Sequence, residues 1–308
     1  MEQMGFSSDD PSGTENLVQE IMHELTLTLY RLDNLRRCMS QEEWKYFCLT
    51  KTTRFSLFEH LLSDPFTKRV FEKHRGYSCD PTASDLLLGL EELKISIPLG
   101  RKIFQFIYKS DFANAIRHRR EYIQYFIRDT SKTYNIPFTI LSVLSGNIRE
   151  IEHSKSFKSK ILNNITAYDP DGCTIKTINK LYSHFGVKSI NGTLNDLIFQ
   201  KPINCQFNLV YSTGLLDHLD KHLAQKTIKS LFDLVQDSGY LLLTNFRENT
   251  PNTLYRTYLE AFTNWFIYYR TDEEMIDLFS DIDPSGIDDF QLNTDPCCNI
   301  TYLLVRKK

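Results

Sequence analysis

The chain has 308 residues, enough for one large or two ordinary domains with an ample core. A hydrophobic content of 41%, a charged content of 24% and a net charge of -3 are typical of a soluble globular protein and argue against a nucleic-acid-binding chain. No apolar run approaches the roughly 20 residues that span a bilayer, and the N-terminus lacks the features of a signal peptide. We therefore expect a cytoplasmic protein with no membrane span, or one exported by a route that the sequence does not reveal. The seven cysteines have no zinc-site spacing, so reduced thiols and no metal site are expected.

The N-terminal part of the chain predicts only helices. Residues 1–14 are polar, with Gly and Pro, which indicates a disordered tail. From Glu15 apolar residues recur at helical spacing, and Ser40 with Glu43 is a capping-box signature for a second helix. Further helices are expected at residues 56–62, 84–94, 99–108 and 111–133. We predict an all-α cap domain over residues 15–135.

After Pro137 short apolar runs alternate with helical segments. The expected strands are residues 140–144, 165–168, 187–190, 207–211 and 240–244. The expected helices between them include residues 172–185 and 221–235. Such alternation indicates a parallel sheet covered on both faces. A capping-box helix from Thr271 precedes two late strands, at residues 289–292 and 300–305, which lack a helix between them and are expected to pair antiparallel. We predict that residues 136–308 form a Rossmann-like α/β domain.

The segment Thr139–Glu152, TILSVLSGNIREIE, is expected to open this domain as a strand, a small-residue turn at Ser145-Gly146 and a helix. Small residues let the backbone approach a ligand closely, and a helix N-terminus adds N–H donors. The turn lacks the G-x-G-x-x-G of a dinucleotide site, so a pyrophosphate is not expected. A plain strand–turn–helix without a ligand is the alternative.

Three more loops are expected at the carboxyl edge of the same sheet, where open α/β sheets bind ligands. Asp169, with Asp171 in the same turn, ends the second strand and is placed to accept hydrogen bonds from a ribose diol. The loop Thr193–Asn195 follows the third strand and would lie near an adenine. The fourth strand leaves the sheet through Tyr211–Gly214. For the first two loops, an ordinary Asp-Pro turn and a glycine turn with a helix cap are the alternatives.

The stretch Phe207–Leu219, FNLVYSTGLLDHL, and the glycine turn before the fifth strand resemble S-adenosylmethionine-dependent methyltransferases. The stretch is similar to the element DLVYSAGLFDYL of a bacterial family that includes the hydroxypalmitate methyl ester synthase. Four other segments are similar to that family in the same order: 73–80 (KHRGYSCD; family KPRGYAGD), 116–120 (IRHRR; family VRARR), 145–150 (SGNIRE; family CGPARE) and 265–270 (WFIYYR; family WYLIYR).

The resemblance covers about residues 64–308, and the first 60 residues match nothing. Family Cys-Gly-Pro becomes Ser145-Gly146-Asn147, still small and polar enough for a cofactor loop. A family tyrosine becomes His218, and the glycine before Asp80 becomes Cys79. The last two changes are expected to alter the substrate pocket.

The resemblance implies an enzyme that uses S-adenosylmethionine to O-methylate the carboxylate of a small or fatty-acid-like molecule, giving a methyl ester. A carboxylate is already ionised near pH 7, so it needs no general base. The expected cofactor-binding residues are Ser145, Gly146, Glu150, Asp169, Asp171, Thr193, Leu194, Asn195, Tyr211, Ser212 and Gly214. The expected acceptor-binding residues are Arg75, Tyr77, Asp80, Arg119, Trp265, Tyr268 and Arg270.

His218 and Tyr211 are the candidate catalytic residues. His218, oriented by Asp217, would be a general base for a hydroxyl or amine acceptor, and a solvated histidine at a helix start is the alternative. Trp265 and Tyr268 are either core aromatics or walls of an acceptor pocket that contact the sulfonium through cation–π interactions. The alternative to an enzyme is a binding or effector module that holds S-adenosylmethionine without catalysing a reaction.

The helical domain is expected to cover the cofactor site as a lid that excludes water. Within it, Arg75 or Arg119 would hold a carboxylate of the acceptor or of the cofactor, and Asp80 would pair with one of these arginines when the site is empty. A small-molecule acceptor is the expected partner, and a homodimer is left open.

Overall fold

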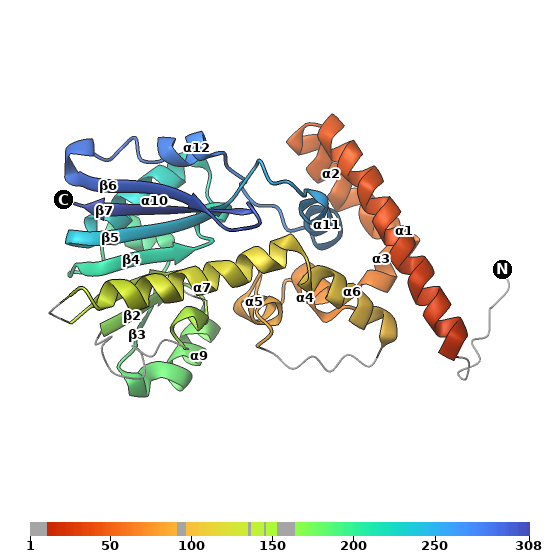
Figure 1. The fold of residues 1–308 in the computed structure, drawn as a ribbon, viewed down its shortest axis with the longest axis horizontal. Coiled ribbons are helices and arrows are strands. Elements are labelled where there is room, and N and C mark those ends of the chain that lie inside the picture. The colour runs from red at the N-terminus through yellow and green to blue at the C-terminus, as the bar shows by residue number, and fades with distance from the viewer. Residues whose placement is uncertain (1–10, 91–96, 135–136, 145, 153–163) are drawn as a thin grey trace. The chain divides into compact units, whose positions relative to one another are not determined.

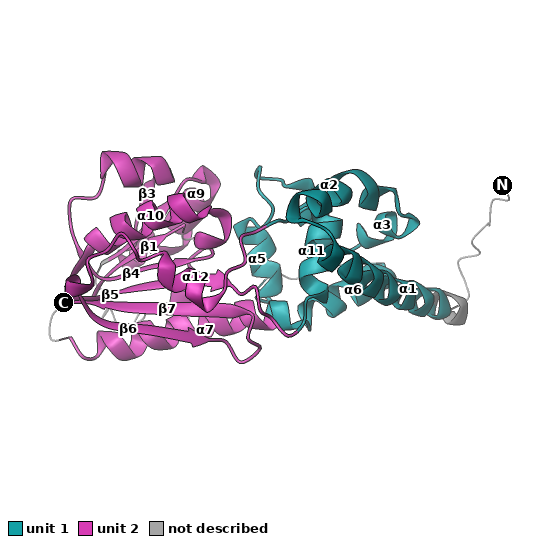
Figure 2. Ribbon diagram, turned by 90° about the horizontal axis from the view of Figure 1, so that it is seen from above, with its two compact units in different colours: residues 1–113, 252–266 teal, residues 114–251, 267–308 magenta. Residues whose placement is uncertain are grey.

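A computed structural model describes residues 11–90, 97–134, 137–144, 146–152 and 164–308. The chain forms two compact units, shown in different colours in Figure 2. Unit 1 comprises residues 1–113 and 252–266, and unit 2 comprises residues 114–251 and 267–308.

Unit 1 is helical in its described residues. Its elements are α1 (Pro11–Cys38), α2 (Gln41–Lys51), η1 (Thr52–Arg54), α3 (Ser56–Leu61), α4 (Pro65–Glu72), α5 (Pro81–Leu87), α6 (Pro98–Tyr108) and α11 (Leu254–Thr263). The predicted capping box is confirmed, because the Ser40 hydroxyl accepts from the Glu43 N–H and the Glu43 carboxylate accepts from the Ser40 N–H. Helix α5 begins at its Asp80 cap, earlier than the predicted helix at residues 84–94, of which residues 91–94 lie outside the described residues.

Helix α11 joins unit 1 although it follows the fifth strand in the sequence. It packs against α1, α2 and α4. Buried polar contacts fix it there: the Trp44 indole N–H donates to Glu260 at 2.7 Å, and the Thr257 hydroxyl donates to Asp33 at 2.8 Å. The unit is therefore built from two segments of chain, which differs from the single predicted boundary between residues 135 and 136, themselves outside the described residues.

Unit 2 contains a seven-stranded sheet with the order β3-β2-β1-β4-β5-β7-β6 (Figure 1). The strands are β1 (Thr139–Val143), β2 (Asn164–Asp169), β3 (Lys188–Asn191), β4 (Phe207–Thr213), β5 (Val235–Phe246), β6 (Ile287–Thr294) and β7 (Ile300–Lys307). The first five are parallel, and β7 runs antiparallel between β5 and β6. The predicted strands and the antiparallel pairing of the last two are confirmed. The fold is a mostly parallel, Rossmann-like sheet with late antiparallel strands, accompanied by an N-terminal helical region.

Helices cover both faces of this sheet. The helices are α7 (Asp111–Ser131), α9 (Gly172–Tyr182), α10 (Lys221–Asp233) and α12 (Asp272–Asp277). One face packs on α7 and α9, with Ile123, Ile127 and Ile178 against Leu209 and Leu242. The other face packs on α10 and α12. Near-continuous apolar strands follow from this double cover, as in β4, where all residues but the last are buried.

Helix α7 runs along one face of the sheet in the direction opposite to the parallel strands (Figure 1). Near its end, Phe126 meets Tyr240 early in the regular part of β5, whereas Tyr122 stacks on Tyr302 beside the end of β5. The arginine-rich start of α7 therefore lies at the carboxyl edge of the parallel strands. Among the described residues, no helix is both long and apolar enough to cross a membrane.

Candidate functional site

The strand order reverses between β1 and β4, which are direct neighbours. In open α/β sheets the crevice for ligands lies at the carboxyl ends of such a pair of strands. The loop after β1 is wound through positive φ at Leu144 (53°), Gly146 (51°) and Ile148 (44°). Such values are strained for Leu and Ile, and this strain tends to gather at functional sites. The predicted cofactor residue Ser145 lies outside the described residues.

Asp169 joins the loop after β1 to the end of β2. Its side chain is 4% exposed. The carboxylate accepts a hydrogen bond from the Gly146 N–H at 3.0 Å and another from the Asp171 N–H at 2.9 Å. The acidic end of β2 and the turn after β1 are thus in direct contact.

Asp171 and the loop after β3 have structural partners of their own. The Asp171 carboxylate caps α9, accepting from the Cys173 N–H at 2.8 Å. Thr193 accepts from the Asp196 N–H while Asp196 accepts from the Thr193 N–H and hydroxyl. The second arrangement corresponds to the alternative of a glycine turn with a helix cap, and it places Leu194 and Asn195 at the carboxyl edge beside β2. Gly192 is needed here, because a Cβ would lie 2.2 Å from the Tyr168 hydroxyl oxygen.

Tyr211 and Glu150 form a buried pair. The Tyr211 hydroxyl donates to Glu150 Oε1 at 2.5 Å, and Tyr211 has no exposed surface. Burial raises the pKa of Glu150, and burial together with the neighbouring Glu150 carboxylate raises the pKa of Tyr211. Glu150 lies in the 3₁₀ turn η2 (Arg149–Ile151), so the pair links the loop after β1 to β4.

The exit of β4 brings together Gly214, Arg119 of α7 and Asp217. Gly214 has φ 91°, and a Cβ there would lie 3.3 Å from Asp217 Oδ2 and 3.6 Å from Arg119 Nη1. A glycine therefore satisfies both the backbone conformation and the close approach. Just before it, the Ser212 hydroxyl donates to the Val143 carbonyl at 2.5 Å and ties β4 to β1. Arg119 is thus placed next to the predicted transfer site.

Asp217 and His218 point to different surroundings. Asp217 is buried, and its carboxylate accepts from the Phe246 N–H at 2.9 Å. Burial raises its pKa to about 7, against the opposing effect of Arg119 and Arg270. His218 is exposed, and partial desolvation lowers its pKa. Among the described residues no hydrogen bond joins the two, so the predicted orientation of His218 by Asp217 is not present.

Arg270 supports the loop after β4. Its guanidinium is buried and donates to the carbonyl oxygens of Leu216, at 2.6 Å, and Leu219, and to Asn245 Oδ1 at 2.6 Å. It also lies over the ring of Tyr268, which is 46% exposed. These bonds hold the loop against the end of β5, a structural role that the acceptor assignment of Arg270 did not anticipate.

The other predicted acceptor residues, Arg75, Tyr77, Asp80 and Trp265, belong to unit 1. Asp80 is 1% exposed and is clamped by Arg69, with Nε–Oδ1 at 2.8 Å and Nη2–Oδ2 at 2.7 Å, while Arg75 Nε lies 3.8 Å away. Burial acts to raise the pKa of Asp80, but the bonds from Arg69 and the Ala83 N–H outweigh it and lower the pKa.

The sequence did not reveal that Arg69 is the partner of Asp80, because Arg69 lies outside the motif at residues 73–80. A basic residue in the last turn of a helix, as Arg69 is in α4, is too common to indicate such a pair. Tyr77 is partly exposed. Trp265 is buried against Phe112 in an edge-on contact. The structure thus places the described residues among the cofactor candidates at one sheet edge and divides the acceptor candidates between two units.

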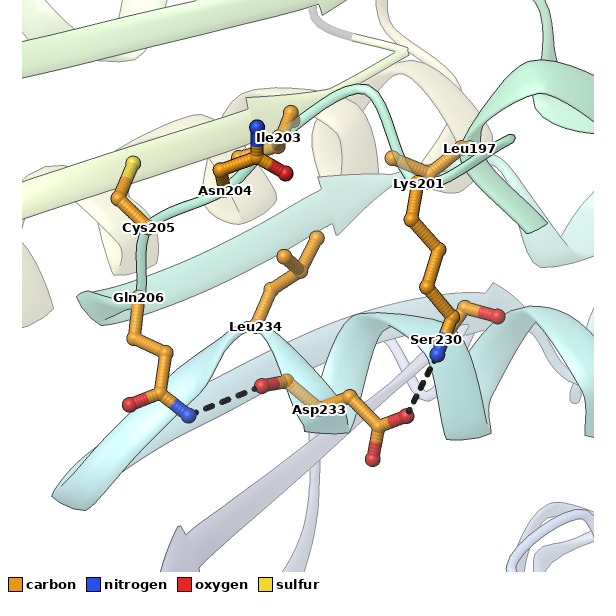
Figure 3. A pocket seen from close by; sticks show the side chains of 9 residues that line it. All are labelled: Leu197, Lys201, Ile203, Asn204, Cys205, Gln206, Ser230, Asp233 and Leu234. Carbon is orange, nitrogen blue, oxygen red and sulfur yellow. Dashed lines mark hydrogen bonds and ion pairs between the residues drawn. The ribbon is translucent and has the colours of Figure 1, made fainter. Parts of the chain in front are cut away.

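A cavity of about 430 Å³ lies elsewhere in unit 2 (Figure 3). Its lining includes Gln206, just before β4 begins, and Leu234, just before β5 begins. These positions place it at the amino edge of the parallel strands. At its rim the Gln206 amide donates to the Asp233 carbonyl, and Lys201 lies 4.0 Å from the Asp233 carboxylate. It is therefore separate from the candidate site.

No protein-family model matches this chain, and no curated protein matches it. A possible exported protein from Bordetella parapertussis is similar in structure, with a TM-score of 0.62 and 13% identity over 97% of this chain and 99% of that one. A candidate methyltransferase from Thermobifida fusca YX has a TM-score of 0.51 and 14% identity over 83% and 99% of the two chains.

The magnesium protoporphyrin IX methyltransferase from Synechocystis PCC 6803, solved with bound S-adenosylhomocysteine, has a TM-score of 0.49 and 13% identity, covering 79% of this chain and 100% of that one. At these identities the first two similarities establish a shared fold. The chain therefore shares its fold with the candidate methyltransferase from Thermobifida fusca YX.

Proposed function

We propose that this chain is a methyltransferase that binds S-adenosylmethionine at the carboxyl edge of the sheet, between the loop after β1 and the exit of β4. The observation that carries the proposal is the contact between Asp169 and the Gly146 N–H. It puts a buried carboxylate beside a small-residue turn at the point where the strand order reverses. A ribose diol needs such an acceptor, and the methionine part needs a backbone that it can approach closely.

The residues at this edge fit the cofactor in chemical type. Asp169 would accept from the ribose hydroxyls, and the backbone around Gly146 and Gly214 would flank the methionine part. The loop from Thr193 to Asn195 would lie near the adenine. When bound, the cofactor supplies a methyl group made electrophilic by its sulfonium.

A carboxylate acceptor suits the groups present. Tyr211 is fully buried and donates to Glu150, so its hydroxyl serves as a positioning group for the loop after β1 rather than as a base. A carboxylate near pH 7 is ionised and needs only to be aligned with the methyl group and kept from water. We therefore favour O-methylation of the carboxylate of a small or fatty-acid-like molecule.

A hydroxyl or amine acceptor is the second candidate, and His218 favours it. The imidazole is exposed, and its lowered pKa keeps it neutral at pH 7, the form that can accept a proton. If His218 is the base, activity rises with pH through a single ionisation and His218→Asn abolishes that dependence. With a carboxylate acceptor the profile is flat above about pH 6, and the variant stays active.

Calorimetric titration with S-adenosylmethionine and S-adenosylhomocysteine tests the cofactor assignment. We expect the wild-type chain to bind both. Asp169→Asn should weaken binding by about 1–3 kcal/mol, because a charged acceptor is lost. Asp233→Asn, at the opposite sheet edge, is the matched control and should bind like wild type. A folded wild-type chain that binds neither compound, or an Asp169→Asn variant with unchanged affinity, would contradict the assignment.

A further inference from the structure

A polar row of side chains crosses the α7 face of the sheet at the end of β4. Thr213, Thr244 and Tyr302 are register partners on the neighbouring strands β4, β5 and β7, so their side chains share a face. One step back along the strands, the row of Tyr211, Leu242 and Leu304 belongs to the core under α7. The polar row thus lies beside the exit of β4, between this apolar row and the buried pair of Phe246 and Ile300 further along β5 and β7.

Two hydroxyl groups of this row are buried and lack partners. Tyr302 is 2% exposed and Thr244 is 1% exposed. Among the described residues, neither the Tyr302 hydroxyl nor the Thr244 hydroxyl has a hydrogen-bond partner. Folded proteins satisfy the large majority of buried polar side-chain atoms, so two unsatisfied hydroxyls on directly opposed residues require an explanation.

Arg119 supplies a positive charge near Tyr302. Within the described residues, the Arg119 guanidinium interacts electrostatically with Tyr302, Asp217 and Glu150 and makes no hydrogen bond. It also lies 3.6 Å from the position that a Cβ of Gly214 would take. Guanidinium N–H groups are strong donors that pair with carboxylates.

We propose that Arg119, Tyr302 and Thr244 form a subsite that holds the carboxylate of the methyl acceptor. The inference rests on the proposed function, which places the cofactor next to it at the ends of β1 and β4. Neighbouring strands lie about 4.8 Å apart, so a group held between β5 and β7 lies about 7 Å from β4. One carboxylate oxygen would accept from the two hydroxyls and the other would face Arg119 and the transfer site. An oxygen left with a single guanidinium contact keeps more of its nucleophilicity than one clamped by several donors.

Tyr302→Phe and Thr244→Val test the subsite, because each removes one hydroxyl and keeps the shape of the side chain. The probe is octanoate, with the neutral octanamide for comparison, titrated into the chain saturated with S-adenosylhomocysteine. We expect wild type to bind octanoate more tightly than octanamide. Each variant should bind octanoate about tenfold or more weakly, as the loss of one hydrogen bond to a charged group predicts. Tyr240→Phe, further back on the same face of β5, is the matched control and should bind octanoate like wild type.

The outcomes separate the two proposals. Loss of octanoate affinity with unchanged S-adenosylhomocysteine affinity supports the subsite. Unchanged octanoate affinity in both variants would overturn the inference. The same holds if Tyr302→Phe raises the free energy of unfolding without changing octanoate affinity, because the hydroxyls would then hold structural water and not the acceptor. Wild type that binds S-adenosylhomocysteine but not octanoate also overturns it and leaves the cofactor assignment intact. Wild type that binds neither contradicts the proposed function itself.

Discussion

Replacing Arg69 should destabilise unit 1 far more than replacing Arg75. Arg69 makes two bonds of 2.8 and 2.7 Å to the Asp80 carboxylate, which is 1% exposed, whereas Arg75 Nε lies 3.8 Å from it. Removing one partner of a buried ion pair costs about 3–5 kcal/mol, because the other charge stays buried without compensation. The remaining bond from the Ala83 N–H moderates this cost, so we expect about 3 kcal/mol for Arg69→Met and a smaller loss for Arg75→Met.

Urea unfolding followed by indole fluorescence measures both variants, since both tryptophans, Trp44 and Trp265, belong to unit 1. The pKa of Asp80 is lowered in the folded chain, so the stability that the pair supplies is present above the unfolded pKa and is lost as the pH falls through the folded value. The difference between wild type and Arg69→Met should therefore shrink in acid. Equal losses for Arg69→Met and Arg75→Met at pH 7, or a difference that does not change with pH, would refute the assignment of the pair.

Three further changes test the carboxyl edge of unit 2. Burial raises the pKa of Asp217 from 3.8 to about 7, so the folded chain loses stability as the pH rises from 4 to 7 and this carboxyl ionises. The unfolding free energy of wild type should therefore fall relative to that of Asp217→Asn by an amount on the order of 4 kcal/mol. Chemical denaturation followed by circular dichroism measures this difference. A constant difference would contradict this. Gly214→Ala should lower the midpoint of thermal unfolding, because φ is 91° and the new Cβ meets Asp217 Oδ2 at 3.3 Å, and an unchanged midpoint would show that the loop relaxes freely. Tyr211→Phe should cost about 1–3 kcal/mol at pH 7, because Glu150 loses its donor in a buried site, and a neutral effect in the same denaturation assay would mean that water replaces the hydroxyl.

Local signals in the sequence were sufficient for most secondary structure. The capping boxes at Ser40 and Thr271 both form as their spacing predicts. The parallel strands could be predicted because their apolar runs are buried on both faces of the sheet. The position of Asp169 at the carboxyl edge could be predicted because this residue ends one of those strands.

Contacts between distant residues could not be predicted in the same way. The Arg270 guanidinium donates to carbonyl oxygens more than 50 residues away, and no local pattern marks an arginine that pairs with backbone. Tyr302 lies within the apolar run ITYLLV of β7, where the sequence predicts only a core residue, and its unsatisfied hydroxyl and its register with Thr244 are visible only in the structure. The membership of α11 in unit 1 likewise depends on packing between segments some 200 residues apart.

The split of unit 1 between residues 1–113 and 252–266 also dictates an order of events during synthesis. Helix α1 leaves the ribosome long before α11 exists, yet Asp33 on α1 and Trp44 on α2 need Thr257 and Glu260 on α11 as partners. Until residue 266 has been made, the N-terminal helices carry exposed apolar surface and unsatisfied polar groups, which favours binding by chaperones and aggregation. A chain truncated near residue 250 should leave the N-terminal helices unable to fold stably, even though none of their own residues is missing.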